Sequence, residues 1–197
     1  AGHRRDDLLV GAPLFMARRS DGQRSELGRL YLYLGQQRLA GPPQTLTGTH
    51  PYGRFGAAIA SLGDMDKDGF GGRRARGVFT SLLSPDVAVG APQGGDGGSG
   101  QVLIFRGHSE GLAPVPTQRL ESPFPGPAAF GFALRGATDL DGNGYADLLV
   151  GAYGAAKVAV YLGLPVVVAR TQLSVPDGLN PEILDCSLPS TSVPVSW

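Results

Sequence analysis

Two short acidic segments hold the side chains best suited to chemistry in this sequence. Each carries an oxygen-bearing side chain at every second position, followed by a glycine. They read Asp64-Met-Asp66-Lys-Asp68-Gly-Phe70 and Asp139-Leu-Asp141-Gly-Asn143-Gly-Tyr145-Ala-Asp147. Alternate side chains of a tight loop turn their oxygens inward, and the glycine permits the sharp bend. Because calcium binds several hard oxygen ligands, the pattern predicts calcium loops.

The second segment is expected to bind one calcium ion through side-chain oxygens and one backbone carbonyl. The predicted ligands are Asp139, Asp141, Asn143, Asp147 and the carbonyl of Tyr145. The first segment would use Asp64, Asp66, Asp68, the carbonyl of Phe70, and Asp86 at the start of the next strand. No nitrogen or sulfur ligand lies nearby, which argues against zinc. An acidic turn closed by its own hydrogen bonds, without metal, remains the alternative.

The two segments are not EF-hands. An EF-hand needs a bidentate glutamate at the twelfth loop position and a helix on either side. That position holds Ala75 and Val150, and each segment leads toward a strand that begins with aspartate. Residues 71–84 interrupt the first segment with three arginines and no acid. We expect this insertion to weaken the first site.

Three strand pairs repeat along the chain and would position these loops. The first strands are Asp7–Pro13, Asp86–Pro92 and Asp147–Tyr153, and the second strands, each ending in glycine, are Arg29–Gly35, Gln101–Gly107 and Lys157–Gly163. Apart from the insertion, the period is about 60 residues, which suits one propeller blade per repeat. An open β-sandwich with accidental similarity is the alternative.

The composition agrees with many short strands joined by tight turns. The chain has 31 glycines and 16 prolines in 197 residues, and no helical apolar period of useful length. Its formal net charge of +0 provides no bulk attraction to nucleic acid or to an anionic membrane. Cys186 is the single cysteine, which excludes a disulfide-built core within this sequence. The three histidines are far apart, and no catalytic triad is supported.

The order of these motifs resembles the FG-GAP repeat of integrin alpha subunits. In that repeat a Phe-Gly pair precedes an acidic loop, and a strand ending in Gly-Ala-Pro follows it. The matching residues are Phe55-Gly56, Asp64–Gly69 and Gly90-Ala-Pro92, and then Phe130-Gly131 and Asp139–Tyr153. The resemblance implies an all-β chain that forms the last blades of a β-propeller and then the start of an Ig-like sandwich. The implied segments are 1–54, the end of one blade; 55–129, a blade with the insertion; 130–163, the final blade; and 164–197, the start of an Ig-like thigh domain.

The resemblance also implies a non-catalytic adhesion receptor on the cell surface. Such a receptor pairs with an integrin beta subunit, here beta-3-like, and binds fibrinogen-like ligands. Its membrane anchor would lie in C-terminal segments outside this sequence, and the calcium loops would stiffen the propeller. The alternative function is a propeller region of a secreted hydrolase such as glycosylphosphatidylinositol phospholipase D. The β-patterned stretch 166–175 after the last repeat, followed by Cys186, favours the receptor.

Overall fold

The computed structural model describes residues 7–18, 22–35, 42–63, 85–108, 110–164, 186–187 and 194–195. The chain divides into two units, Ala1–Val166 and Val167–Trp197. In the described residues all regular structure is β, apart from two 3₁₀ turns, η1 (Asp96–Gly98) and η2 (Tyr153–Ala155). The predicted all-β class is therefore confirmed. No helix among these residues is long and apolar enough to cross a membrane.

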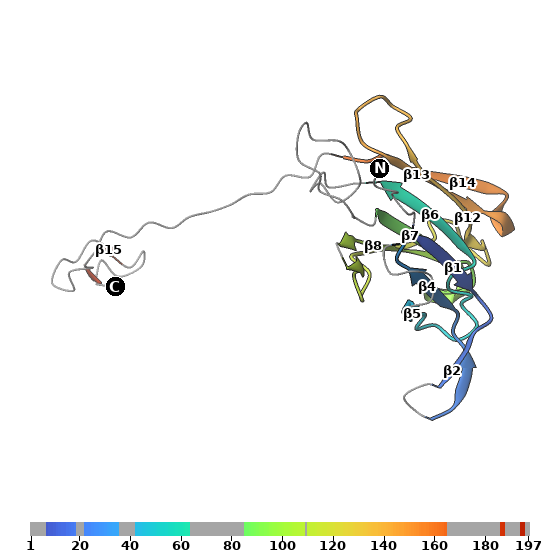
Figure 1. Cartoon of the computed structure of the whole chain (residues 1–197). Coiled ribbons are helices and arrows are strands. Elements are labelled where there is room, and N and C mark those ends of the chain that lie inside the picture. The colour runs from blue at the N-terminus through green and yellow to red at the C-terminus, as the bar shows by residue number, and fades with distance from the viewer. Residues whose placement is uncertain are drawn as a thin grey trace, which may run out of the picture. The chain divides into compact units, whose positions relative to one another are not determined.

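The first unit contains three antiparallel sheets whose strands follow one another along the chain (Figure 1). Sheet 1 has the order β1 (Leu8–Ala12), β4 (Arg29–Tyr33), β5 (Gln44–Thr47). Sheet 2 has the order β11 (Gln118–Glu121), β8 (Gln101–Phe105), β7 (Asp86–Ala91), β6 (Ala58–Gly63). Sheet 3 has the order β12 (Phe130–Thr138), β13 (Asp147–Ala152), β14 (Lys157–Tyr161).

Three two-stranded ribbons complete the described structure. They are β2 (Met16–Arg18) with β3 (Arg24–Glu26), β9 (Gly107–His108) with β10 (Gly111–Leu112), and, in the second unit, β15 (Cys186–Ser187) with β16 (Pro194–Val195). The first ribbon lies between β1 and β4 of sheet 1, and the second lies between β8 and β11 of sheet 2.

The strand pairs predicted from the repeat are present, and they share one register. The alanine that ends the first strand faces the residue that begins the second strand in every sheet. These pairs are Ala12–Arg29, Ala91–Gln101 and Ala152–Lys157. Since a slip of one residue would reverse every side chain, the equal register places equivalent residues on equivalent faces.

Sheet 2 lies between the other two sheets, and its two faces fill two cores. In Figure 1 its green strands separate the blue strands of sheet 1 from the orange strands of sheet 3. Val87 and Val89 pack with Leu30 of sheet 1, whereas Ala88 packs with Val150 of sheet 3. Every residue of β7 and β8 is buried, which explains why these strands read as continuous apolar runs.

Glycines let the backbones of successive sheets meet directly. A Cβ atom on Gly11 would overlap the carbonyl oxygen of Gly56, and a Cβ atom on Gly90 would overlap that of Gly131. The phenylalanines next to the second members also contact the preceding sheet, through parallel bridges that pair Gly28 with Phe55 and Gly100 with Phe130. The Phe-Gly pair and the Gly-Ala-Pro turn are therefore two halves of one contact between sheets.

A second link joins sheet 1 to the ribbon that follows β8. The Gln44 side chain donates from Nε2 to the carbonyl of Leu112 (2.6 Å) and accepts from the Leu112 backbone N–H at Oε1 (2.8 Å). This amide makes with Leu112 the pair of hydrogen bonds that a strand residue would make.

We predict that Gly90→Ala destabilises the fold by about 1–3 kcal/mol, because the new methyl group must displace the backbone of Gly131. Urea unfolding of the full chain measures this loss. Gly151→Ala is the matched control, since it occupies the same repeat position and its Cβ would first meet the Ala133 side chain, at 3.3 Å. Equal losses for the two variants would contradict the proposed role of the glycine contact.

Candidate metal centre

The acidic segment 139–147 connects β12 to β13 at the end of sheet 3. β12 ends at Thr138, and Asp147 is the first residue of β13. Between them the chain turns through Gly142 (φ 76°) and Gly144 (φ 85°), a backbone region that favours glycine. The segment is thus a short loop held at both ends by paired strands.

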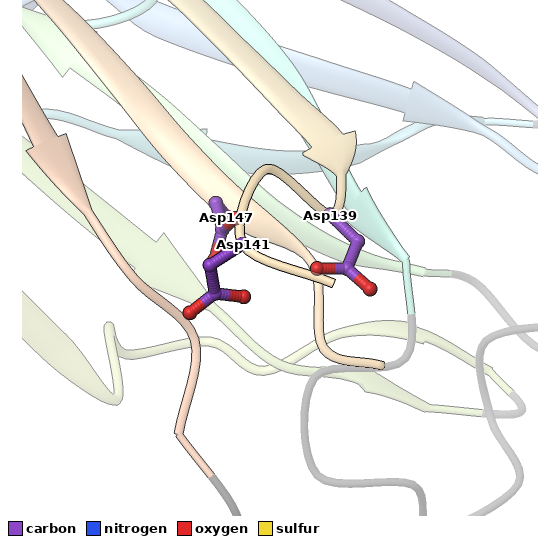
Figure 2. Close-up of side chains that lie close together, drawn as sticks. All are labelled: Asp139, Asp141 and Asp147. Carbon is purple, nitrogen blue, oxygen red and sulfur yellow. The ribbon is translucent and has the colours of Figure 1, made fainter. Parts of the chain in front are cut away.

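Three carboxylates of this loop come together (Figure 2). One oxygen from each of Asp139, Asp141 and Asp147 lies within 4.8 Å of the others. Two ligands of one calcium ion lie up to about 5 Å apart, because each Ca–O distance is about 2.3–2.6 Å. Asp139 and Asp141 are exposed, whereas Asp147 is only 1% exposed. The arrangement fits an all-oxygen cation site open to solvent on one side.

Backbone amides already surround the Asp139 carboxylate. Its Oδ1 accepts from the N–H groups of Gly142 (2.8 Å) and Asn143 (3.1 Å), and its Oδ2 accepts from Gly144 (2.8 Å). The hydrogen bond from Gly144, with further help from Gly142, Asp141 and Asn143, lowers the pKa of Asp139 despite opposing desolvation. The loop therefore favours the charged form that a cation needs.

Asn143 is attached to the same cluster, but through its amide NH₂ group. Nδ2 donates to Asp141 Oδ2 (3.0 Å) and to the carbonyl of Gly163 (2.8 Å). Oδ1 accepts from the N–H of Tyr145 (2.8 Å). In this arrangement the Asn143 NH₂ group holds the loop to the end of β14.

Asp147 also accepts backbone hydrogen bonds that stabilise the fold, a role that the sequence pattern did not reveal. Its Oδ1 accepts from the buried N–H of Gly163 (2.7 Å), and its Oδ2 accepts from Leu140 N–H (2.6 Å). The same bond recurs in each sheet, from Gly107 to Asp86 (2.9 Å) and from Gly35 to Asp7 (2.8 Å). The aspartate at the start of each first strand, which in sheet 1 is Asp7 directly before β1, therefore accepts a hydrogen bond from the glycine that follows each second strand. The signal was present as an aspartate and a glycine at equivalent positions of all three repeats.

The predicted first site is described only at its last member. Asp86 is 9% exposed and makes the bond to Gly107 given above. The other predicted ligands, Asp64, Asp66, Asp68 and Phe70, lie outside the described residues, as does the insertion 71–84. In the second site the structure brings Asp139, Asp141 and Asp147 together.

Comparison with known proteins places this loop in a recognised repeat. Residues 130–163, which include sheet 3 and the acidic loop, match the family model "FG-GAP repeat". The chain thus contains an all-β repeat with an acidic loop between its first two strands.

The relatives extend this similarity to almost the whole chain. Integrin alpha-IIb of Mus musculus is 55% identical over 99% of the chain, and integrin alpha-IIb of Homo sapiens is 54% identical over the same share. Integrin alpha-5 of Xenopus laevis is 45% identical over 97% of the chain. The chain belongs to the integrin alpha-subunit family, and it spans 17–18% of the length of these relatives.

We predict that Asp86→Ala destabilises the fold by about 1–3 kcal/mol, because the buried N–H of Gly107 loses its charged acceptor. Asp96→Ala, at an exposed aspartate of η1, serves as the control. Thermal unfolding of both variants measures the difference, and an unchanged midpoint for Asp86→Ala would refute this structural role.

We also predict that the 139–147 loop loses stability in acid. The pKa of folded Asp139 lies below its unfolded value, so its contribution to loop stability is complete above about pH 4 and is lost as the pH falls through the folded value. Amide exchange of Gly142, Asn143 and Gly144, corrected for intrinsic rates, should accelerate over that range. In Asp139→Asn the acceleration should disappear. Its persistence would assign the effect to another group.

Proposed function

We propose that this chain is the calcium-stabilised end of the propeller of an integrin alpha subunit, and that calcium binds the 139–147 loop. The observation that carries the proposal is the cluster of three carboxylates at the start of β13. Asp139, Asp141 and Asp147 would supply charged oxygens, and the carbonyl of Tyr145 would complete one side. Asn143 would turn its Oδ1 toward the ion. Its NH₂ group would then give up its hydrogen bonds to Asp141 and Gly163.

Calcium is favoured over softer metals by the donor set. The clustered groups offer carboxylate oxygen alone, and the cluster found among the described residues contains no histidine or cysteine. A bound ion would neutralise three carboxylates that otherwise repel one another. Because Asp147 also holds Gly163, the ion would stabilise both the loop and the end of sheet 3. Asp64, Asp66, Asp68, the carbonyl of Phe70 and Asp86 would form the equivalent site of the preceding repeat.

Exposed apolar side chains on the two outermost sheets support the proposal of a propeller. Leu8 and Val10 of β1 are 48% and 41% exposed, and Val158 and Val160 of β14 are 60% and 52% exposed. These side chains alternate with neighbours that pack into the cores between sheets. Apolar residues at every second position of an outer strand fit a further sheet on each side, as in a ring of blades. Segment 1–54 would be the end of one blade, 55–129 the next blade and 130–163 the final blade, and 164–197 would be the start of an Ig-like thigh domain.

The biological role follows from the family rather than from a reacting group. The full receptor would be a non-catalytic adhesion protein at the cell surface, anchored by segments outside this sequence. It would pair with an integrin beta subunit, with beta-3 favoured by similarity to alpha-IIb, and bind fibrinogen-like proteins. In this proposal the 139–147 loop stabilises the propeller and does not contact the adhesive ligand.

Titration calorimetry with calcium tests the site. Asp141→Ala should weaken calcium binding by about tenfold or more, because affinity in such loops follows the number of charged ligands. The matched control, Asp96→Ala, removes an exposed aspartate outside the loop and should bind like the unmodified chain. If Asp141→Ala binds calcium as the control does, the ion does not occupy this loop.

A further inference from the structure

The 139–147 loop contains an Asn-Gly sequence in an exposed turn. Asn143 and Gly144 are both exposed, and Gly144 has φ 85°. A glycine offers no side chain to hinder attack by its own backbone nitrogen on the preceding side chain. We propose that Asn143 is a site of spontaneous deamidation, and that the product makes the loop dependent on a bound cation.

The reaction needs only water. The backbone nitrogen of Gly144 attacks Cγ of Asn143, loses its proton, and forms a five-membered succinimide. The bond from Cγ to Nδ2 breaks, and the nitrogen leaves as ammonia after taking up a proton. Water then opens the ring at one of its two carbonyls, which yields aspartate or isoaspartate. The neutral amide is thereby replaced by a carboxylate.

The loop controls this reaction through the hydrogen bonds of the reacting groups. The N–H of Gly144 donates to Asp139 Oδ2 at 2.8 Å, which withholds the attacking nitrogen. The Asn143 amide is held at Tyr145 N–H, Asp141 and Gly163. The ring therefore closes only in molecules whose loop has opened, and removal of the Asp139 acceptor increases their share.

The product cannot keep the contacts of the amide. Nδ2 donates to Asp141 Oδ2 at 3.0 Å and to the buried carbonyl of Gly163 at 2.8 Å. After deamidation, carboxylate oxygens replace the amide, so no NH₂ group remains to donate to these acceptors. The new charge lies beside Asp141, and Gly163 loses a donor to its carbonyl. A cation bound among the carboxylates offsets the repulsion between the new carboxylate and Asp141. This effect of the cation rests on the proposed calcium site.

Peptide mapping by mass spectrometry, on the full chain incubated at neutral pH with a chelator, tests the modification. We expect a gain in mass of one amide-to-acid conversion at Asn143. Asn180 is the control within the same chain, because it precedes Pro181 and proline has no N–H to lose. Asp139→Ala should accelerate the conversion severalfold, whereas Asp96→Ala should leave its rate unchanged. No conversion at Asn143 in any variant overturns the proposal, and an unchanged rate in Asp139→Ala overturns the control by the loop.

The predicted dependence of the deamidated loop on a cation is tested with Asn143→Asp, which reproduces the aspartate product. Without calcium it should unfold at a lower temperature than the unmodified chain, and its Gly163 amide should exchange faster. Added calcium should reduce both differences. Equal stability without calcium overturns the predicted effect of the product. Conversion at Asn143 with no effect of calcium on either protein supports the modification and counts against the calcium site alone.

Discussion

Direct contact between the backbones of successive sheets is the constraint on which this structure depends. At Gly11 with Gly56, and at Gly90 with Gly131, no Cβ atom can be accommodated. This close approach allows alternate residues of sheet 2 to enter the cores on both sides, so that Val87 and Ala88 are both almost fully buried. Methyl groups at these glycines would hold the sheets apart, and both cores would lose dispersion contacts. The paired motifs in the sequence are therefore a packing requirement.

The same geometry explains how the acidic loop is supported. β13 is bonded on both sides, to β12 and to β14, and Asp147 at its first position is almost fully buried. The loop is thus held at both ends by paired strands, and Asp139 and Asp141 lie in its exposed part. Gly163 lies against Asp147 and Asn143, which ties the end of β14 to the loop. A substitution at Asn143, Asp147 or Gly163 would therefore alter both the candidate cation site and the point where the chain leaves sheet 3.

Strands and loop position could be predicted from the sequence because both repeat. Continuous apolar runs that end in Gly-Ala mark β1, β7 and β13, and the cluster of Asp139, Asp141 and Asp147 follows from their spacing before a strand. The hydrogen bond from Gly163 to Asp147 was missed, since it joins residues separated by a whole strand pair. The amide orientation of Asn143 was also beyond prediction, because it depends on the position of the Gly163 carbonyl. Pattern reveals which groups recur, whereas contacts across the sheet depend on its twist and register.

The pairing of Gln44 with Leu112 has a mechanical consequence. Two hydrogen bonds side by side connect one side chain to one backbone residue across two sheets. A pull along the bonds would load both together, whereas a pull that peels the ribbon away would break them in turn. Their resistance therefore depends on the direction of the force, as it does for strands in a sheet. In a protein under tension, the two hydrogen bonds of Gln44 would therefore break under a smaller force when the ribbon is peeled away than when it is pulled along the bonds.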